Sequence, residues 1–258
     1  MSTEPKITII TVCYNAINLI EETILSVVNQ TYKKIEYIII DGGSTDGTVD
    51  IIKKYTNRLS YWISEPDNGI YDAMKKGISL ASGDYINFMN AGDVFYSNTV
   101  IYDVFNKLNK IYTVIYGSTY MKYSYGDYIV VPDKLEKIKN CMILCHQSVF
   151  VQSTSAKNHL FREKYGLAAD HGMLLELYLD NPENFVQVPD IISIYDAKNG
   201  VSSRNVLKSY EHQSKLTHNN DSLFRKFRIL MRAHLPLWIL KPLGRGYFYF
   251  NKRYKRLH

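Results

Sequence analysis

The sequence predicts an α/β protein in which a largely parallel sheet is flanked by helices. Apolar, strand-like runs alternate with helix-like stretches over the first part of the chain, as in parallel strands joined by helical crossovers. Runs such as Ile7–Val12 and Ile35–Ile40 are almost continuously apolar, which is typical of strands covered on both faces. A chain of 258 residues, 46% hydrophobic and 22% charged, can bury a substantial core.

Each element of the first half has its own signal. A capping box at Asn18-x-x-Glu21 predicts the start of a first helix, whose apolar residues then follow helical spacing as far as Val28. A second helix is predicted over 48–55, after a glycine-rich turn, and a third along the apolar stripe of 70–81. The predicted strands are Ile7–Val12, Ile35–Ile40, Leu59–Ser64 and Tyr85–Met89.

The pattern changes after about residue 110. Strand-like segments over 112–132 surround a turn at Tyr125-Gly126-Asp127, and a helix near 132–140, a strand at 148–152 and a helix at 169–179 follow. This order is typical of α+β structure, and we expect it to continue the first sheet. We therefore divide the chain into residues 1–110, 111–221 and 222–258.

The last of these regions carries most of the excess positive charge. The net charge is +6, yet residues 222–258 contain ten Lys or Arg, eight aromatic residues and no Asp or Glu. Cations and aromatic rings together favour an anionic membrane interface. Binding to nucleic acid and a solvated tail are the alternatives, and we expect no nucleic-acid partner.

Cysteine use and hydropathy indicate the compartment. Cys13, Cys141 and Cys145 are too few for a disulfide framework, and we expect ordinary buried thiols in a reducing environment. The first residues lack a clear cleavage site for a signal peptide. No apolar stretch reaches the length of about 18 residues that a spanning helix requires, so we expect a cytoplasmic protein.

Acidic residues stand where the predicted strands end. Asp41 follows the second strand, Asp67 the third and Asp93 the fourth. Because ligands of open α/β sheets bind beyond the carboxyl ends of strands, these residues predict a polar ligand site. For Asp41 a turn-capping role is an equal alternative. Neither a dinucleotide fingerprint nor a phosphate loop is present.

Four segments in fixed order resemble glycosyltransferase family 2, of the type that builds bacterial cell-surface polysaccharides. They are Ile9–Asn15, Ile40–Thr48, Asp67–Met74 and Asn87–Asp93. The resemblance implies the GT-A fold, a Rossmann-like mixed sheet flanked by helices, here with a basic amphipathic C-terminal tail. It makes residues 1–110 the half that binds the nucleotide-sugar and residues 111–221 the half that binds the acceptor.

The resemblance also assigns roles to single residues. Thr11, Tyr14 and Asp41 fall where the family binds the nucleotide, and Asp67 falls near the ribose and diphosphate. Asn90 and Asp93 occupy the region of the family's Asp-x-Asp motif, which holds Mg²⁺ or Mn²⁺ on the donor. Here Asp93 is the only carboxylate of that segment and therefore the predicted metal ligand.

Two downstream segments, 145–150 and 167–171, resemble the family's acceptor region. Within them, Asp170 lies at the start of a predicted helix and matches the general base of the family. The alternative is a purely structural role as a helix cap. His146 has two possible roles, as a contact to acceptor or phosphate or as a structural histidine.

The implied function is inverting transfer of a hexosyl or N-acetylhexosaminyl group from a nucleotide-sugar, usually a UDP-sugar, to a saccharide hydroxyl. The basic tail favours a polyprenyl-diphosphate-linked acceptor in O-antigen, capsule or exopolysaccharide synthesis, at the inner face of the cell membrane. The alternatives are a sugar nucleotidyltransferase, a donor-binding pseudoenzyme and a membrane scaffold without transfer activity.

Overall fold

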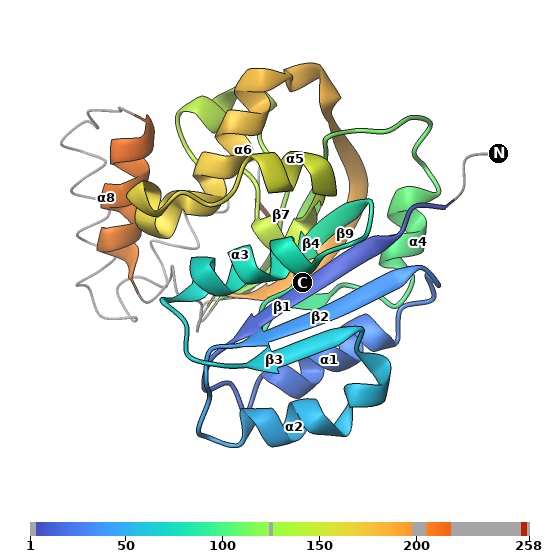
Figure 1. Cartoon of the computed structure of the whole chain (residues 1–258). Helices are drawn as coiled ribbons and strands as arrows, with labels where there is room; N and C mark the ends of the chain where they lie inside the picture. Colours follow the sequence, from blue (N-terminus) through green and yellow to red (C-terminus); the bar gives the residue numbers. More distant parts are fainter. Residues whose placement is uncertain (1–3, 124–125, 198–204, 218–253, 257–258) are drawn as a thin grey trace.

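A computed structural model of the chain describes residues 4–123, 126–197, 205–217 and 254–256 (Figure 1). These residues form a ten-stranded mixed sheet, whose main path runs in the order β10-β7-β6-β8-β4-β1-β2-β3, with β9 and β5 joined beside β6. The predicted α/β class, with a mixed sheet flanked by helices, is confirmed.

Four parallel strands form the first half of the sheet. They are β1 (Ile7–Cys13), β2 (Ile35–Asp41), β3 (Tyr61–Ser64) and β4 (Tyr85–Phe88). All four were predicted, although β3 begins later than expected because a 3₁₀ turn, η1 (Thr56–Arg58), precedes it. The order β4-β1-β2-β3 puts β1 at the centre, with a parallel neighbour on either side.

The second half continues the same sheet, as expected. Its strands are β5 (Val94–Phe95), β6 (Val114–Tyr123), β7 (Gly126–Val130), β8 (Val149–Gln152) and β9 (Phe185–Asp196). β8 joins the halves because it pairs antiparallel with both β4 and β6.

The long strand β9 was not predicted. Its sequence contains Pro189, and a proline argues against a paired strand because it cannot donate a ladder hydrogen bond. In the structure, the pairing of β9 with β6 has an irregular register that accommodates the proline. β9 pairs with β6 up to Gln187 and again from Ile191, so that the proline lies in the shifted stretch.

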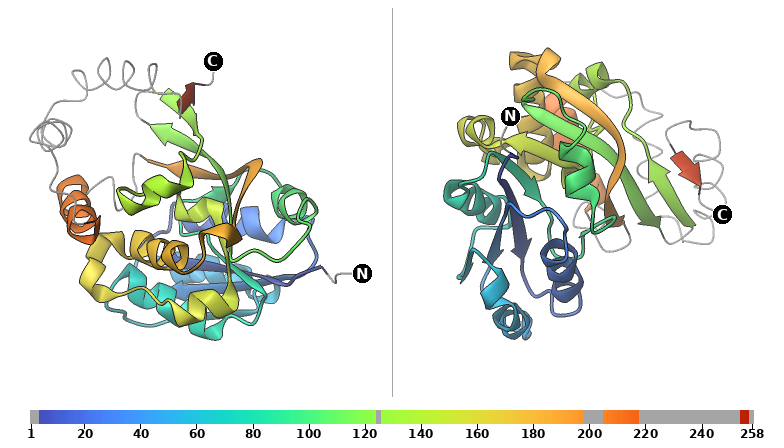
Figure 2. Two further views of the ribbon diagram at one scale, coloured as in Figure 1. Left: turned by 90° about the horizontal axis from the view of Figure 1, so that it is seen from above. Right: turned by 90° about the vertical axis from the view of Figure 1, so that its right-hand side faces the viewer.

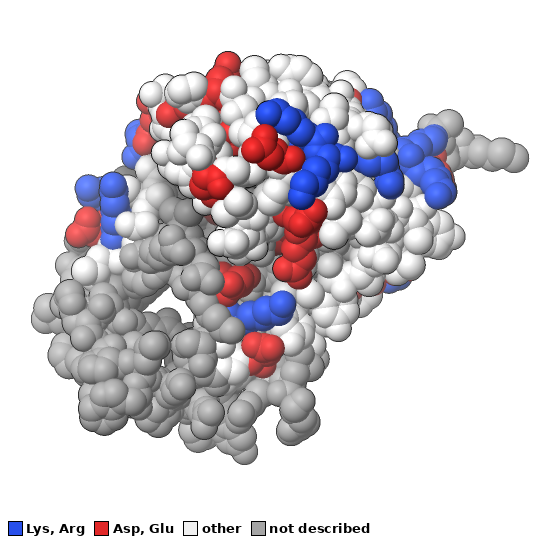
Figure 3. Space-filling view, turned by 90° about the horizontal axis from the view of Figure 1, so that it is seen from below, with Lys and Arg blue, Asp and Glu red and all other residues white. Residues whose placement is uncertain are grey.

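Helices cover both faces of the sheet (Figure 1). One face carries α3 (Ile70–Leu80), η2 (Leu135–Lys139), α5 (Ser153–Asn158) and α6 (Ala169–Asp180). The other face carries α1 (Ile20–Val28), α2 (Thr48–Lys54) and α4 (Val100–Phe105). On the face that carries α2, acidic and basic side chains of the described residues are interspersed (Figure 3).

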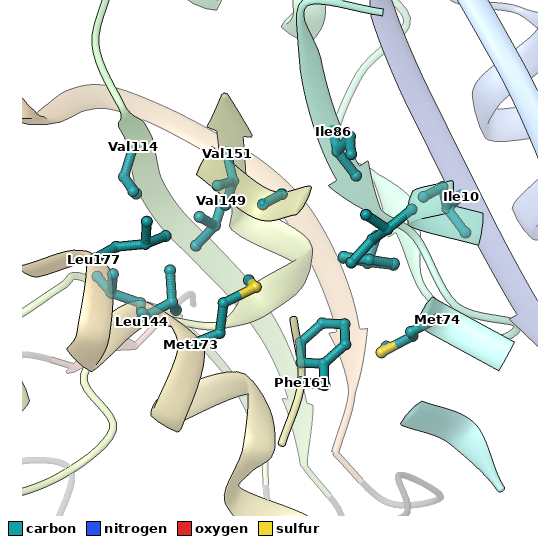
Figure 4. Packing of buried hydrophobic residues seen from close by; sticks show 14 of the residues in the cluster. Ile10, Met74, Ile86, Val114, Leu144, Val149, Val151, Phe161, Met173 and Leu177 are labelled. Carbon is teal, nitrogen blue, oxygen red and sulfur yellow. The ribbon is translucent and has the colours of Figure 1, made fainter. Parts of the chain in front are cut away.

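The alternation of β1 explains the two hydrophobic cores. Ile10 and Val12 belong to the core under α3 and α6, whereas Ile7 and Ile9 belong to the core under α1 and α4. Successive residues of a strand point to opposite faces, so a continuous apolar run serves both layers. Figure 4 shows the first core, in which Met74, from α3, and other apolar side chains meet the strands.

One local prediction was wrong, and one predicted helix is shorter and of another type. α1 begins at Ile20, its N-cap is Leu19, and no side chain caps it, so the capping box at Asn18 does not form. The backbone amide of Ile20 instead bonds to the carbonyl of Ala16. The helix predicted near 132–140 is the short 3₁₀ helix η2, which buries Ile138 alone.

Three 3₁₀ helices and one further α-helix complete the second half of the chain, as far as the structure describes it. They are η3 (His146–Ser148), η4 (Glu163–Ala168), η5 (Pro182–Asn184) and α8 (Val206–Thr217). α8 lies beside η4, and the Leu167 amide donates to Nδ1 of His212 at 2.8 Å. The three cysteines are free thiols: Cys13 is buried as expected, but Cys141 and Cys145 are partly exposed.

Most of the basic tail, residues 222–258, lies outside the described residues. Its described piece, β10 (Tyr254–Arg256), pairs antiparallel with β7 and extends that edge of the sheet (Figure 2). Among the helices of the described segments, none is long and apolar enough to cross a membrane.

Candidate active site

The predicted site residues of the first half meet at one edge of the sheet. In the register of the strands, Cys13 lies opposite Asp41, and Asp41 lies opposite Ser64. The chain beyond β4 stays beside β1, because the Ala91 amide donates to the carbonyl of Val12 at 3.1 Å. The carboxyl ends of β1, β2, β3 and β4 therefore surround one place, where ligands of open α/β sheets bind.

Asp41 is fully buried, and its carboxylate accepts hydrogen bonds from its own chain. The donors are the amides of Gly43 and Ser44, at 3.2 and 2.8 Å, the hydroxyls of Ser44 and Ser64, and the thiol of Cys13. These bonds shape the turn after β2, as the turn-capping alternative requires. Nucleotide binding by this side chain stays a prediction.

Thr11 and Tyr14, the other two predicted nucleotide contacts, differ in access. Thr11 is fully buried, and its hydroxyl donates to the carbonyl of Met89 at 2.7 Å and lies 2.9 Å from the hydroxyl of Tyr37. It thus joins β1 to the end of β4. Tyr14 is 66% exposed, which leaves its ring free to stack on a flat group such as a nucleobase.

A set of residues that was not predicted positions Tyr14. Asn15 has a φ of +46°, and its amide donates to Oγ of Ser44 at 2.7 Å while its Oδ1 accepts from the amide of Thr45 at 3.0 Å. The Ala16 amide donates to Oγ1 of Thr48 at 2.8 Å. The loops after β1 and β2 are therefore fixed to each other. The only hint in the sequence is the abundance of side chains in 44–48 that commonly bond to backbone.

Asp67 lies against the loop after β2. Gly42 makes this approach possible, because a Cβ atom there would lie 2.6 Å from Oδ2 of Asp67. The other carboxylate oxygen, Oδ1, accepts from the amide of Gly69 at 2.8 Å, just before α3 begins. Asp41 and Asp67, predicted from separate motifs, are brought together here.

The turn from Asn90 to Asp93 is fixed by α1. Gly92 has a φ of +97°, a conformation that favours glycine, and its amide donates to Oγ1 of Thr23 at 3.0 Å. The hydroxyl of Thr23 in turn donates to the carbonyl of Asp93 at 2.8 Å. The polar side chain of Thr23, buried in α1, thus holds the turn from both ends.

The electrostatics of this turn suit a divalent cation. Asp93 is 6% exposed, and burial raises its pKa to about 7, although the charge of His146 and a hydrogen bond with Gln147 lower it. Asn90 Oδ1 is buried and makes no hydrogen bond with any described residue. A carboxylate whose ionised form is disfavoured by burial, and an amide oxygen without a partner, are both suitable ligands for Mg²⁺ or Mn²⁺. Phosphates and water would complete the coordination shell.

No cluster of three or more His, Cys, Asp or Glu that could hold a metal occurs among the described residues. A cation at this turn would therefore depend on oxygens of a bound diphosphate. The residues present fit such a cation, and Asp93 and Asn90 would be its protein ligands.

Asp170, the predicted base, lies in the first turn of α6 and does not cap it, because the N-cap is Ala168. Its Oδ1 accepts from the Tyr71 hydroxyl at 3.3 Å and from the His171 amide at 2.8 Å, and its Oδ2 lies 3.4 Å from Nδ1 of His146. Burial raises the pKa of Asp170, but the hydrogen bond and charge of His146 outweigh it and lower the pKa below its usual value. The carboxylate is thus ionised and able to accept a proton.

His146 joins the two halves of the site. Its Nε2 lies 3.1 Å from Nδ2 of Asn90, while its Nδ1 faces Asp170. Burial lowers the pKa of His146, but Asp170 and Asp93 raise it above its ordinary value. The side chains of His146 and Asp170 keep 26% and 20% of their surface exposed, so the pair is reachable from solvent.

A small cavity of about 10 Å³ lies on the apolar side of this pair, with room for about one water molecule. Its lining includes His146 and Asp170 together with Met74, Phe161 and Met173, which converge from three segments in Figure 4. The Asp170 carboxylate therefore has an apolar wall on one side.

Comparison with known proteins agrees with this picture. The model of the family "Glycosyl transferase family 2" matches residues 8–208. An uncharacterized glycosyltransferase of Mycobacterium tuberculosis strain H37Rv is 32% identical over 191 residues, which cover 69% of this chain and 71% of that protein.

Solved structures share the fold at low sequence identity. TarS 1–349 of S. aureus in complex with UDP-GlcNAc has a TM-score of 0.65 at 17% identity, over 88% of this chain and 71% of that one. The mannosyltransferase PcManGT from Pyrobaculum calidifontis, in complex with GDP-Man and Mn²⁺, has a TM-score of 0.65 at 15% identity, over 96% and 75%.

The mixed sheet, with its polar site at the carboxyl edge of the parallel strands, has the GT-A fold of these structures. Since the family model covers more than half of the sequence, the chain belongs to glycosyltransferase family 2.

Proposed function

We propose that this chain is an inverting glycosyltransferase that moves a hexosyl or N-acetylhexosaminyl group from a UDP-sugar to a hydroxyl of a saccharide acceptor. One observation carries the proposal. The buried Asn90–Asp93 turn, suited to a cation on a diphosphate, is joined through His146 to the ionised carboxylate of Asp170. Leaving-group stabilisation and proton removal are the two demands of glycosyl transfer, and both are met within one hydrogen-bonded set.

The reaction step follows from these roles. The acceptor oxygen forms a bond to the anomeric carbon while the bond from that carbon to the diphosphate oxygen breaks, and the acceptor proton moves to Asp170. A single displacement of this kind inverts the anomeric centre. A divalent cation, when bound, neutralises charge on the departing diphosphate.

The donor end is assigned to the loops around Tyr14, Asp41 and Asp67. The exposed ring of Tyr14 suits stacking on uracil, and Asp67, half-buried beside Gly42, suits hydrogen bonds from ribose hydroxyls. In the solved structures TarS carries UDP-GlcNAc and PcManGT carries GDP-Man with Mn²⁺, so related folds accept both a uridine and a guanosine donor.

The acceptor end is assigned to the second half of the chain. The basic, aromatic composition of 222–258 supports a membrane-bound acceptor, a saccharide on polyprenyl diphosphate, and a peripheral position at the inner face of the cell membrane. Synthesis of a cell-surface polysaccharide is the setting that this acceptor implies.

A panel of donors tests the proposal. The full-length protein is incubated with UDP-glucose, UDP-N-acetylglucosamine or GDP-mannose in Mn²⁺, and release of the nucleoside diphosphate is followed with and without chelator. We expect turnover of a UDP-sugar that chelator abolishes. Binding of UDP without turnover of any donor, in the presence of extracts that supply lipid-linked saccharides, would instead identify a donor-binding scaffold.

A further inference from the structure

Both ring nitrogens of His146 are engaged by groups of the site, and they face opposite halves of it. Nδ1 lies 3.4 Å from Oδ2 of Asp170, and Nε2 lies 3.1 Å from Nδ2 of Asn90. These two partners are 80 positions apart in the sequence. Among the described residues, the imidazole is the group that contacts both of them.

The hydrogen-bond partners define the protonation of the ring. The amide nitrogen of Asn90 can only donate, so Nε2 accepts and the neutral ring carries its proton on Nδ1. Nδ1 is therefore a donor to Asp170. Nδ1 is also protonated in the imidazolium form, so the bond to Asp170 exists in either state of the ring.

The backbone that carries His146 is held in place from the sheet. Asn87 of β4 is fully buried, and its Nδ2 donates to the carbonyls of Gln147 and Val149, at 3.0 and 2.9 Å. The buried hydroxyl of Ser148 bonds to β6 and to β9. A 3₁₀ turn with this many buried hydrogen bonds has little freedom, so the imidazole enters the site from a fixed point.

The carboxylate of Asp170 needs such an anchor. It lies in the first turn of α6, where no side chain caps the helix, and an apolar cavity adjoins it. Its other bonds, from Tyr71 and from the His171 amide, both go to Oδ1. Among the contacts of the described residues, that of His146 Nδ1, 3.4 Å away, alone engages Oδ2, and so restricts rotation of the carboxylate.

We propose that His146 is a positioning residue for the transfer proposed above. Through Nδ1–H it fixes the rotation of the Asp170 carboxylate, and through Nε2 it holds the side chain of Asn90 so that Oδ1 stays free for a cation. The proton acceptor and the diphosphate end of the site thereby keep a fixed separation. This inference rests on the proposed function. It adds a role for His146, and turnover by the parent protein would not by itself demonstrate that role.

A matched pair of substitutions separates the two ring nitrogens. An asparagine amide can take the place of Nδ1, and a glutamine amide that of Nε2. We expect His146→Gln, which loses the donor to Asp170, to lower kcat for UDP-sugar turnover by about 10- to 100-fold. His146→Asn keeps that donor, and its kcat should stay within about 5-fold of the parent.

The second nitrogen is tested without turnover. Calorimetric titration of UDP in the presence of Mn²⁺ should show weaker binding for His146→Asn, which loses the contact to Asn90, and unchanged binding for His146→Gln. Each variant should therefore be impaired in one measurement only: His146→Gln in kcat and His146→Asn in UDP binding. Equal effects of both variants on kcat and on UDP binding would overturn the proposal and indicate a merely structural histidine.

Two controls complete the test. His159, which pairs with Asp180 at the surface 2.8 Å away, is changed to Asn and to Gln and should leave both measurements unaltered. In the Asp170→Asn background, His146→Gln should cause no further loss of kcat, because a positioning residue acts through the group that it positions. A fully additive loss contradicts the inference.

A spectroscopic measurement keeps the proposal testable even if the parent turns over none of these donors. In full-length protein labelled with ¹⁵N-histidine, the signal that His146→Asn removes should show a proton on Nδ1 and not on Nε2 in the neutral ring. A neutral ring protonated on Nε2 would rule the proposal out. Failure of turnover in the parent, with the expected signal, contradicts only the proposed function.

Discussion

Gly42 leaves the space in which Asp67 lies: a Cβ atom at position 42 would come 2.6 Å from Oδ2 of Asp67. The two residues belong to different loops, which follow β2 and β3. Since real Cβ atoms do not approach an oxygen so closely, any side chain at position 42 must displace the carboxylate.

Replacing Gly42 by alanine should therefore damage donor binding more than folding. We expect UDP affinity to fall by about 10-fold, the loss of about 1.4 kcal/mol that one displaced hydrogen-bonding group causes. Calorimetric titration of UDP measures the loss. If the clash is the cause, Gly42→Ala combined with Asp67→Ala should bind no more weakly than Asp67→Ala alone.

Substitution of the predicted base should separate binding from chemistry. Asp170→Asn keeps the size of the side chain but cannot take up the acceptor proton, so kcat should fall by about 10²- to 10⁴-fold. UDP affinity in Mn²⁺, measured by calorimetry, should stay within about 2-fold of the parent, because Asp170 makes no hydrogen bond to the described residues Tyr14, Asp41 and Asp67. Equal turnover by variant and parent would remove Asp170 from the role.

Removal of the carboxylate from the Asn90–Asp93 turn should weaken binding of the cation. Asp93→Asn leaves an uncharged amide in a buried place, and the concentration of Mn²⁺ needed for half-maximal UDP binding should rise by about 10- to 100-fold. Without Mn²⁺ the variant and the parent should bind UDP alike. Full activity of the parent in chelator would refute the assignment of a metal to Asp93.

Glu36 gives the fold a pH dependence of defined sign. Burial raises the pKa of this carboxylate, but hydrogen bonds from Lys6, Ser82 and Thr8 outweigh it and lower the pKa to about 2. The stabilisation is therefore complete above the unfolded value of about 4.3 and is lost as the pH falls toward 2.

Glu36→Gln should accordingly lower the free energy of unfolding by about 1 to 3 kcal/mol at pH 6. The difference from the parent should shrink as the pH falls below about 4, measured by urea denaturation at a series of pH values. Glu183→Gln, at an exposed position, is the control and should change neither quantity. A difference that grows toward acid pH would contradict the assignment.

The basic tail predicts attachment to anionic lipid. Deletion of 222–258 is a poor test, since it also removes β10 from the edge of the sheet beside β7. Changing Arg225, Lys226 and Arg228 to Glu avoids this loss. At about 1 kcal/mol for each cation, partitioning onto phosphatidylglycerol vesicles should fall by at least about 100-fold, while UDP-sugar turnover stays unchanged. Unaltered sedimentation with the vesicles contradicts membrane binding by these residues.

Much of the fold could be predicted because its signals are local. The apolar runs that became β1 and β2 are short, buried on both faces and bounded by turns, and the stripe of α3 has a clear helical period. β9 escaped prediction because Pro189 argues against a strand, whereas its irregular pairing with β6 accommodates the proline. The false capping box at Asn18 shows the reverse, a local signal that tertiary contacts override.

The sequence alone determined the class of fold, the family and the acidic strand ends at Asp41, Asp67 and Asp93, since each depends on residue types at short spacing. Only the tertiary structure decided how these residues are used. In the folded chain, Asp41 and Thr11 are buried and form hydrogen bonds with other residues of the protein, whereas Tyr14 is exposed.

Only the tertiary structure also brought His146 between Asn90 and Asp170. The physical reason is that a hydrogen bond depends on distance and direction in space. Asn90 and Asp170 lie 56 and 24 positions away from His146, so they can contact it only once the sheet has formed.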